Sequence, residues 1–295
     1  CLTTIVWYLL TIFYNAAHKL VAHEIRLPLT IAAGELLSGT LLLLPSWIFN
    51  KPNKDDFVTL WKKFGNIGFS HALATLLSAL SMYLDGQYMT VHNIAKALEP
   101  LICLSLTLQY DSKDLNEIPR EILFSLVLIV LGTIVASPVT LSRGSWAAFV
   151  LHTLAIIFGQ IVPTLSQRYA SMSIDSTTPW AQASGRSDSQ NRNEIATRTN
   201  NVIDNISNPN FIKVITLYAT TVAIPVALVF ESGKWQKVWH ELKNQEEGPW
   251  GDVQLLVNNT VMAGMAHYLI QRCAFRLLQD ISPLSLSVGC AARRA

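Results

Sequence analysis

Charged side chains are scarce in this 295-residue chain: Asp, Glu, Lys and Arg make up 14% of it, whereas 51% is hydrophobic and the mean hydropathy is +0.32. Soluble domains carry about 25% charged residues, so this chain is too apolar for a surface that faces water. Neither sign is in clear excess, because 22 basic and 20 acidic residues leave a net charge of +2. A nucleic-acid partner, which requires a basic excess, is therefore not indicated.

Cysteine pairs and the common catalytic patterns are also lacking. The four cysteines, Cys1, Cys103, Cys273 and Cys290, are scattered without CxxC spacing, which argues against a disulfide framework and a zinc site. The sequence contains no GxxxxGK[ST] loop, no HExxH pair and no Ser-His-Asp spacing. We therefore expect no enzyme activity, no metal and no cofactor.

Long apolar stretches dominate instead. A helix needs roughly 20 apolar residues to cross a bilayer core, and eight stretches of about this length occur, with a ninth beginning at Pro283. The prediction is an all-α, polytopic membrane protein. The eight predicted spans are Leu2–Lys19, Leu27–Phe49, Phe64–Leu84, Gln87–Tyr110, Glu121–Ser137, Trp146–Tyr169, Phe211–Phe230 and Val253–Arg276.

One segment interrupts this pattern. Ser171–Asn210 is rich in Ser, Thr, Asn, Asp and Arg and nearly free of large apolar residues, which predicts a solvated loop without secondary structure.

The distribution of basic residues predicts the orientation in the membrane. Lys and Arg are more frequent in the loops that follow even-numbered spans. By the positive-inside rule, the N-terminus and the long loop lie on the positive-inside face.

A lysine lies within the fourth span. Lys96 comes eleven residues after Asp85, about 16 Å along a helix that starts there, which places it near the middle of a bilayer. One interpretation is an ion pair with Glu99, three residues farther on. The other is a binding site, because a charge at this depth costs about 2.5–3.5 kcal/mol and is usually functional. Pro100 lacks a backbone donor and predicts a kink just beyond this pair.

Two arginines follow the start of the ninth span. Arg293 and Arg294 come ten and eleven residues after Pro283. They are either a basic anchor at the end of a span or, if the helix continues, a charged pair at the depth of Lys96.

In the second case, Lys96, Arg293 and Arg294 are three cations at one depth, and such a group suits a dianionic ligand. Phosphate matches the forked donors of arginine and the point charge of lysine, although carboxylate or sulfate would satisfy the same electrostatics.

The sequence around Lys96 resembles a known family. Ile-Ala-Lys-Ala-Leu-Glu-Pro at 94–100 is similar to the Lys-Ala-Leu/Met-Glu-Pro signature of the plastid triose-phosphate/phosphate translocators, in the drug/metabolite transporter superfamily. Four other segments agree in order and spacing. They are Trp7-Tyr8 with Asn15 and Lys19, Ser70-His71-Ala72-Leu73, Val130-Leu131-Gly132 with Ala136-Ser137, and Ser282-Pro283 with Ser287-Val288-Gly289 and Arg293-Arg294.

The resemblance implies ten transmembrane helices in two inverted five-helix halves, with the substrate site between them. On that map residues 1–137 form the first half and residues 138–295 an incomplete second half, so the chain supplies helices 1 to 8 and the start of helix 9. It begins inside an apolar stretch and ends just after two arginines, and we expect it to be about four-fifths of such a carrier. The family's phosphate-binding lysine falls on Lys96 and its Lys-Arg pair on Arg293 and Arg294.

The contacts to the rest of the substrate match less well. The family's His and Thr in helix 3 align with Thr75 and Ser78, which we predict as weaker substrate contacts. Its Tyr in helix 8 aligns with Ile270, and the neighbouring Asn-Gln with Gln271-Arg272. These departures put triose phosphate as the particular substrate in doubt.

Five further polar residues lie within apolar spans. Glu35 and Gln160 are candidates for the wall of the substrate cavity. His71, His152 and His267 have no partner at ligand spacing, and we interpret them as hydrogen-bonding residues between helices.

The resemblance implies an antiporter that exchanges inorganic phosphate for a phosphorylated C3 or sugar compound across an organelle envelope by alternating access. We expect the plastid inner envelope, or alternatively a Golgi or ER membrane. The expected partners are the phosphorylated metabolite, phosphate and the lipid bilayer. Two alternatives remain open: a nucleotide-sugar transporter of the same superfamily, and a non-transporting membrane protein derived from the family.

Overall fold

Helices make up all the regular structure of the part of the chain that the computed structural model describes, which is residues 2–24, 27–49, 54–85, 90–111, 120–136, 143–175, 209–243, 249–280 and 283–292. The all-α prediction is confirmed for these residues. In chain order the helices are α1 Leu2–Glu24, α2 Pro28–Phe49, α3 Lys54–Asp85, α4 Thr90–Ala97, α5 Glu99–Asp111, α6 Arg120–Ala136, α7 Arg143–Asp175, α10 Pro209–Lys243, α11 Pro249–Asp280 and α12 Pro283–Ala292.

Four of these helices contain a stretch long and apolar enough to cross a membrane: Pro28–Pro45 in α2, Phe64–Leu84 in α3, Trp146–Ser166 in α7 and Phe211–Val238 in α10. The other predicted spans coincide with helices that are more polar, shorter or interrupted, among them α1, α11 and the pair α4 and α5. The chain is thus a membrane protein by the composition of its helices. The arrangement of ten helices in two inverted halves stays a prediction.

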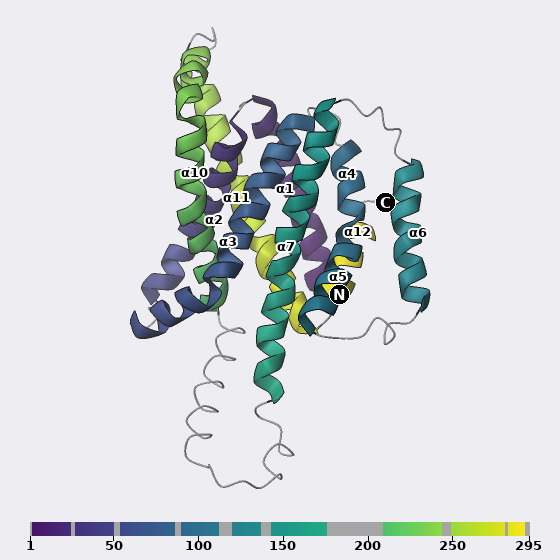
Figure 1. The fold of residues 1–295 in the computed structure, drawn as a ribbon. Coiled ribbons are helices and arrows are strands. Elements are labelled where there is room, and N and C mark those ends of the chain that lie inside the picture. Colours follow the sequence, from purple (N-terminus) through teal and green to yellow (C-terminus); the bar gives the residue numbers. More distant parts are fainter. Residues whose placement is uncertain are drawn as a thin grey trace.

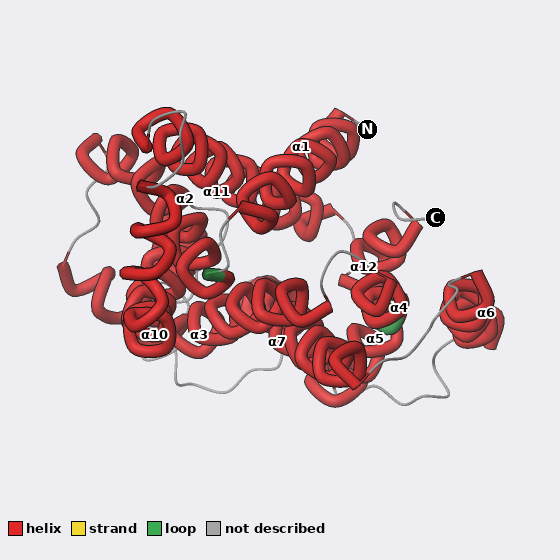
Figure 2. Tube along the Cα trace, turned by 90° about the horizontal axis from the view of Figure 1, so that it is seen from above, coloured by secondary structure: helices red, strands yellow, loops and turns green. Residues whose placement is uncertain are grey.

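The helices of the two predicted halves are packed against each other (Figures 1 and 2): α3 lies along α7, α1 along α11, and α10 against both α2 and α3. Small residues allow the close approach of α2, α3 and α10, whose shared core contains Ala32, Ala72, Ala219 and Ala223. A hydrogen bond of 2.7 Å between the hydroxyls of Thr40 and Thr220 joins α2 to α10.

Apolar side chains cover much of the outer surface. On α6, which packs mainly on α4 at one edge of the molecule (Figure 2), Phe124, Leu128 and Val135 are 65%, 50% and 85% exposed. Such a surface suits hydrocarbon rather than water. The polar groups described below are turned inward.

The predicted fourth span is broken near Pro100, although the break comes between Lys96 and Glu99 rather than just beyond this pair. α4 ends at Ala97, Leu98 is a turn, and α5 begins at Glu99. Proline has no backbone N–H, so the carbonyl of Lys96, four residues before it, loses its helical partner. The Leu98 amide donates instead to the Ala95 carbonyl at 3.0 Å, which tightens the last turn of α4. Lys96 and Glu99 therefore lie on either side of a break.

The polar segment Ser171–Asn210 is shorter than predicted at both ends. α7 continues through Ser171–Asp175, and α10 begins at Pro209, so these residues are helical rather than loop. Helices with enough packed residues behind them extend by a turn into polar sequence, where propensity alone gives no signal. The rest of that prediction, residues 176–208, lies outside the described residues.

Candidate functional site

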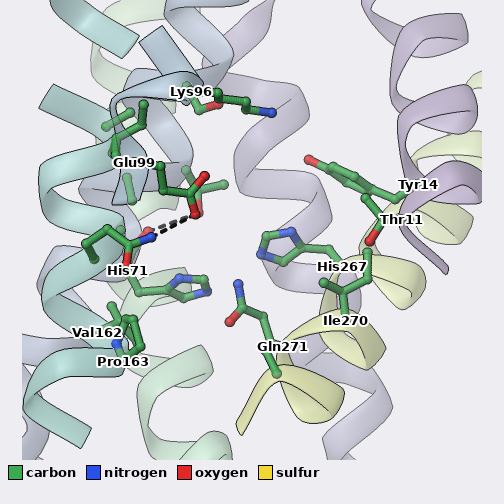
Figure 3. A pocket seen from close by; sticks show the side chains of 18 of the residues that line it. Thr11, Tyr14, His71, Lys96, Glu99, Val162, Pro163, His267, Ile270 and Gln271 are labelled. Atoms are coloured by element: carbon green, nitrogen blue, oxygen red, sulfur yellow. Dashed lines mark hydrogen bonds between the residues drawn. The ribbon is translucent and has the colours of Figure 1, made fainter. Parts of the chain in front are cut away.

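A cavity of about 310 Å³ lies among the helices, lined by residues of both predicted halves. The first half contributes α1, α2, α3, α4 and α5, and the second contributes α7, α11 and α12. Polar side chains from several of these helices converge on it (Figure 3). In an apolar protein such convergence is the usual mark of a binding site.

One side of the cavity is formed at the helix break. Lys96, in the last turn of α4, is partly buried and extends into the cavity (Figure 3). Glu99 opens α5 on the same side, is 9% exposed, and accepts a hydrogen bond of 2.8 Å from Gln160 Nε2 on α7. We call Lys96, Glu99 and Gln160 the lysine side. The C-terminus of α4 carries a partial negative charge, which favours a cation at Lys96.

The facing side carries a carboxylate held by two donors. Tyr14 on α1 projects from across the cavity (Figure 3), and its hydroxyl donates to Glu35 Oε2 at 3.1 Å. His18 Nδ1 lies 2.6 Å from Glu35 Oε1. Glu35, on α2, is 1% exposed, yet it lines the cavity. We call Tyr14, His18 and Glu35 the glutamate side. Buried charge of this kind persists only where partners satisfy it.

Histidine rings lie between the two sides. His71 of α3 stacks on His267 of α11, with ring centroids 5.6 Å apart and an interplanar angle of 18°. The Tyr14 ring lies 5.5 Å from that of His267. His267 Nε2 is buried without a hydrogen-bond partner among the described residues. The prediction of these histidines as hydrogen-bonding residues between helices does not include their place in the cavity. His71, His152 and His267 all line the cavity. His71 of α3 contacts His267 of α11 by ring stacking.

The structure brings three of the five predicted site residues to this cavity. Lys96, Thr75 and Ser78 all line it. The Thr75 hydroxyl donates to the His71 carbonyl at 2.9 Å and keeps its lone pairs for a ligand. Arg293 and Arg294 lie outside the described residues. The helix that precedes them, α12, borders the cavity through Leu286.

The other sequence candidates have separate outcomes. Glu35 and Gln160 both lie in the cavity wall. Of the positions that depart from the family pattern, Ile270 and Gln271 line the cavity, whereas Arg272 is exposed and is not part of the lining. The loss of a family tyrosine at Ile270 thus changes the wall itself.

Sequence reasoning missed Tyr14 and His18. Together with Thr11 and Asn15 they recur three or four residues apart in α1, and all four line the cavity. A polar stripe of this spacing within an apolar span indicates one helix face turned inward. The pairing of His18 with Glu35 has no such local signal, because it depends on how α1 packs beside α2.

The described lining contains one Lys or Arg residue, Lys96, and two carboxylates, Glu35 and Glu99. The positive charge of the described lining is thus at the lysine side. Among the residues that the structure describes, no group of three or more His, Cys, Asp and Glu side chains is placed to hold a metal ion. What the described cavity offers is hydrogen bonds and a localised cation.

Comparison with known proteins gives a family match along the whole chain. The Triose-phosphate Transporter family matches residues 1–295. Among curated relatives, phosphoenolpyruvate/phosphate translocator 2, chloroplastic, of Arabidopsis thaliana is 24% identical over 98% of this chain and 66% of its own length. The non-green-plastid triose phosphate/phosphate translocator of Brassica oleracea var. botrytis is 22% identical, and the chloroplastic one of Zea mays 23%, each over 98% of this chain.

The chain covers 62% of the Brassica relative and 60% of the maize relative, so it spans under two thirds of the length of these proteins. The relatives are named as translocators of phosphate and of two different phosphorylated three-carbon compounds. They are transporters rather than enzymes. The match of the family over residues 1–295, together with the inward-facing polar cavity in an apolar helical frame, shows that the chain belongs to the triose-phosphate transporter family.

Proposed function

We propose that the protein is an antiporter that exchanges inorganic phosphate for a phosphorylated C3 or sugar compound across an organelle envelope by alternating access. The observation that carries this proposal is Lys96, a lysine on an interrupted helix that lines a polar cavity between the two predicted halves. Relatives named for phosphate exchange support it. We place the protein in the plastid inner envelope, because those relatives are named as chloroplastic.

In this proposal the phosphate group binds Lys96 together with Arg293 and Arg294, and Ser78 and Thr75 contribute weaker contacts. Arg293 and Arg294 follow α12 in the chain. α12 packs on α5, the helix that begins directly after the break at Leu98. An arginine fork and a lysine point charge together satisfy several phosphate oxygens. The hydroxyls of Ser78 and Thr75, which lie one turn apart on α3, border the same cavity.

Obligatory exchange has a physical reason. An empty site holds three cations that repel one another and keep their hydration, so enclosing them in the membrane is costly. A bound dianion neutralises most of this charge and allows the two halves to move past it. Only the loaded carrier then changes its facing direction at a useful rate.

Cavity size favours a compact substrate. Ligand pockets commonly measure about 300–1,000 Å³, and this cavity, at about 310 Å³, is at the small end of that range. A phosphorylated three-carbon compound suits this volume better than a nucleotide sugar does.

The test is transport by the full-length gene product in proteoliposomes. We expect labelled phosphate uptake when the vesicles contain phosphate or a phosphate ester. We expect almost none when they contain buffer with neither compound. Uptake that proceeds equally well into empty vesicles contradicts obligatory exchange. Absence of phosphate uptake under both conditions, together with no thermal stabilisation by phosphate, favours a non-transporting protein.

A further inference from the structure

The glutamate side of the cavity bears on which phosphate esters the carrier accepts. We propose, on the basis of the function proposed above, that Glu35 is a specificity-determining residue that selects esters whose other end is an uncharged hydroxyl and rejects esters that carry a carboxylate there. Tyr14 and Lys96 project into the cavity from different sides (Figure 3), and Glu35, which also lines the cavity, is tied by hydrogen bonds to Tyr14 and His18.

The two sides of the cavity divide a bound ester between them. Lys96 supplies the cation at the lysine side, and Tyr14 projects from the opposite side (Figure 3). A small ester whose phosphate binds Lys96 therefore turns its carbon end toward Tyr14, Glu35 and the histidine rings. The polar groups of these residues decide which carbon ends fit.

Glu35 presents negative charge or none to that end. Its two oxygens accept hydrogen bonds from Tyr14 and His18, so it is engaged as an acceptor. If His18 carries a proton, the pair is neutral, and if it does not, the pair has a charge of −1. Neither state offers the net positive charge that a substrate carboxylate requires, and a carboxylate beside Glu35 is repelled.

A hydroxyl meets no such conflict. It can donate to a remaining lone pair of Glu35 or to the Tyr14 oxygen, and it can accept from a histidine N–H, because a hydroxyl has both a donor and lone pairs. His267 Nε2, buried at the cavity without a hydrogen-bond partner among the described residues, provides a further site that a hydroxyl can satisfy as donor or acceptor. A carboxylate has acceptors only. The glutamate side thus matches a hydroxylated end.

This selection would separate the chain from some of its relatives. The Arabidopsis relative is named for phosphoenolpyruvate, a phosphate ester that bears a carboxylate. The triose phosphates named for the Brassica and maize relatives bear none. The position of Glu35 therefore favours the second class of substrate over the first.

The experiment compares two esters that differ only at this end, glycerol 3-phosphate and 3-phosphoglycerate, as competitors of labelled phosphate uptake in proteoliposomes of the full-length protein. We expect glycerol 3-phosphate to compete at least tenfold better. Equal competition by the two esters in the unmodified protein overturns the proposal without any variant. Absence of phosphate uptake refutes the proposed antiport instead, so the two failures are distinguishable.

A variant then assigns the effect to one residue. Glu35→Gln keeps the shape of the side chain and removes its charge, and we expect the ratio of the two competition constants to fall toward one. Glu99→Gln removes a carboxylate from the lysine side, and Ser38→Ala changes α2 one turn beyond Glu35 without touching the lining. Both should keep the ratio of the unmodified protein. An unchanged ratio in Glu35→Gln, or an equal fall in Glu99→Gln, contradicts the assignment to Glu35.

Discussion

The two sides of the cavity are built differently. The lysine side lies where a helix is broken: α4 ends one residue after Lys96, and Glu99 begins the next helix. The glutamate side lies between two unbroken helices, α1 and α2, and its three side chains bond to one another. One side offers a cation at a helix break, whereas the other offers a carboxylate held by two hydrogen-bond donors.

This contrast separates two tasks of a carrier. A broken helix can change its angle at low cost, because the backbone donor of Pro100 is already missing from the helical ladder. That suits a group that must hold its ligand while the halves rearrange. A hydrogen-bonded cluster on intact helices is rigid and suits discrimination, since its polar groups stay in place. The lysine side is thus suited to binding and movement, and the glutamate side to selection.

The largest effect is expected from Lys96→Ala. Removing the cation should lower phosphate homo-exchange at least about 30-fold, which corresponds to about 2 kcal/mol of lost binding, because the desolvated anion would then lose one of its three proposed cationic partners. Lys96→Arg keeps the charge and should retain more activity. The measurement is the initial rate of labelled phosphate uptake. Lys237→Ala, at an exposed position on α10, is the matched control.

A double variant tests whether Lys96 only pairs with Glu99. If Lys96 merely neutralises that carboxylate, Lys96→Ala with Glu99→Gln removes both charges together and should recover exchange. If Lys96 binds phosphate, the double variant stays as inactive as Lys96→Ala. Recovery would remove the functional difference between the two sides of the cavity.

The sequence predicted the lysine side more fully than the glutamate side. Lys96 and Pro100 are only four residues apart in the chain, so a charge inside an apolar run and a missing backbone donor are visible without a structure. The pair of His18 and Glu35 joins two helices, and its partners are 17 residues apart, with no local pattern to connect them. Glu35 could be named as a candidate for the wall, but its partners depend on how α1 packs beside α2.

A smaller effect is expected from a change to the contact that positions the glutamate side. An added Cβ at Gly264 of α11 would lie 2.6 Å from Ser38 Cβ and 2.9 Å from Glu35 Cα. Gly264→Ala must therefore push α2 away, at a cost of about 1–3 kcal/mol or more. We expect a thermal midpoint in detergent several degrees lower, with a smaller preference for glycerol 3-phosphate over 3-phosphoglycerate.

Gly132→Ala is the control for this substitution. Gly132 lies on α6, and a Cβ added there would have no neighbouring atom within 4 Å. Alanine is favoured over glycine in a helix by up to about 1 kcal/mol. The midpoint should stay or rise. Equal behaviour of the two variants would mean that the close approach of α2 and α11 does not hold Glu35 in place.

The smallest effect is expected at Glu231, which ties the start of α2 to α10. Its carboxylate accepts hydrogen bonds from the Leu29 amide at 3.0 Å and from the Thr30 amide and hydroxyl at 2.7 Å each. The first amides of a helix have no partner inside it and carry partial positive charge, so a carboxylate there is stabilising. Glu231→Gln keeps one acceptor, loses the charge and turns an amide donor toward other donors.

We expect Glu231→Gln to lower stability by about 1–3 kcal/mol, seen as a fall in the thermal midpoint that Ser232→Ala, at an exposed neighbouring position, does not cause. Thr30→Val removes one of the three donors, and its effect should not add to that of Glu231→Gln, because both act on one interaction. Strict additivity would mean that α2 is held elsewhere. The rigidity attributed to the glutamate side would then have to come from α1 and α11, since α2 reaches the cavity through Glu35 but is anchored at its first turn by Glu231.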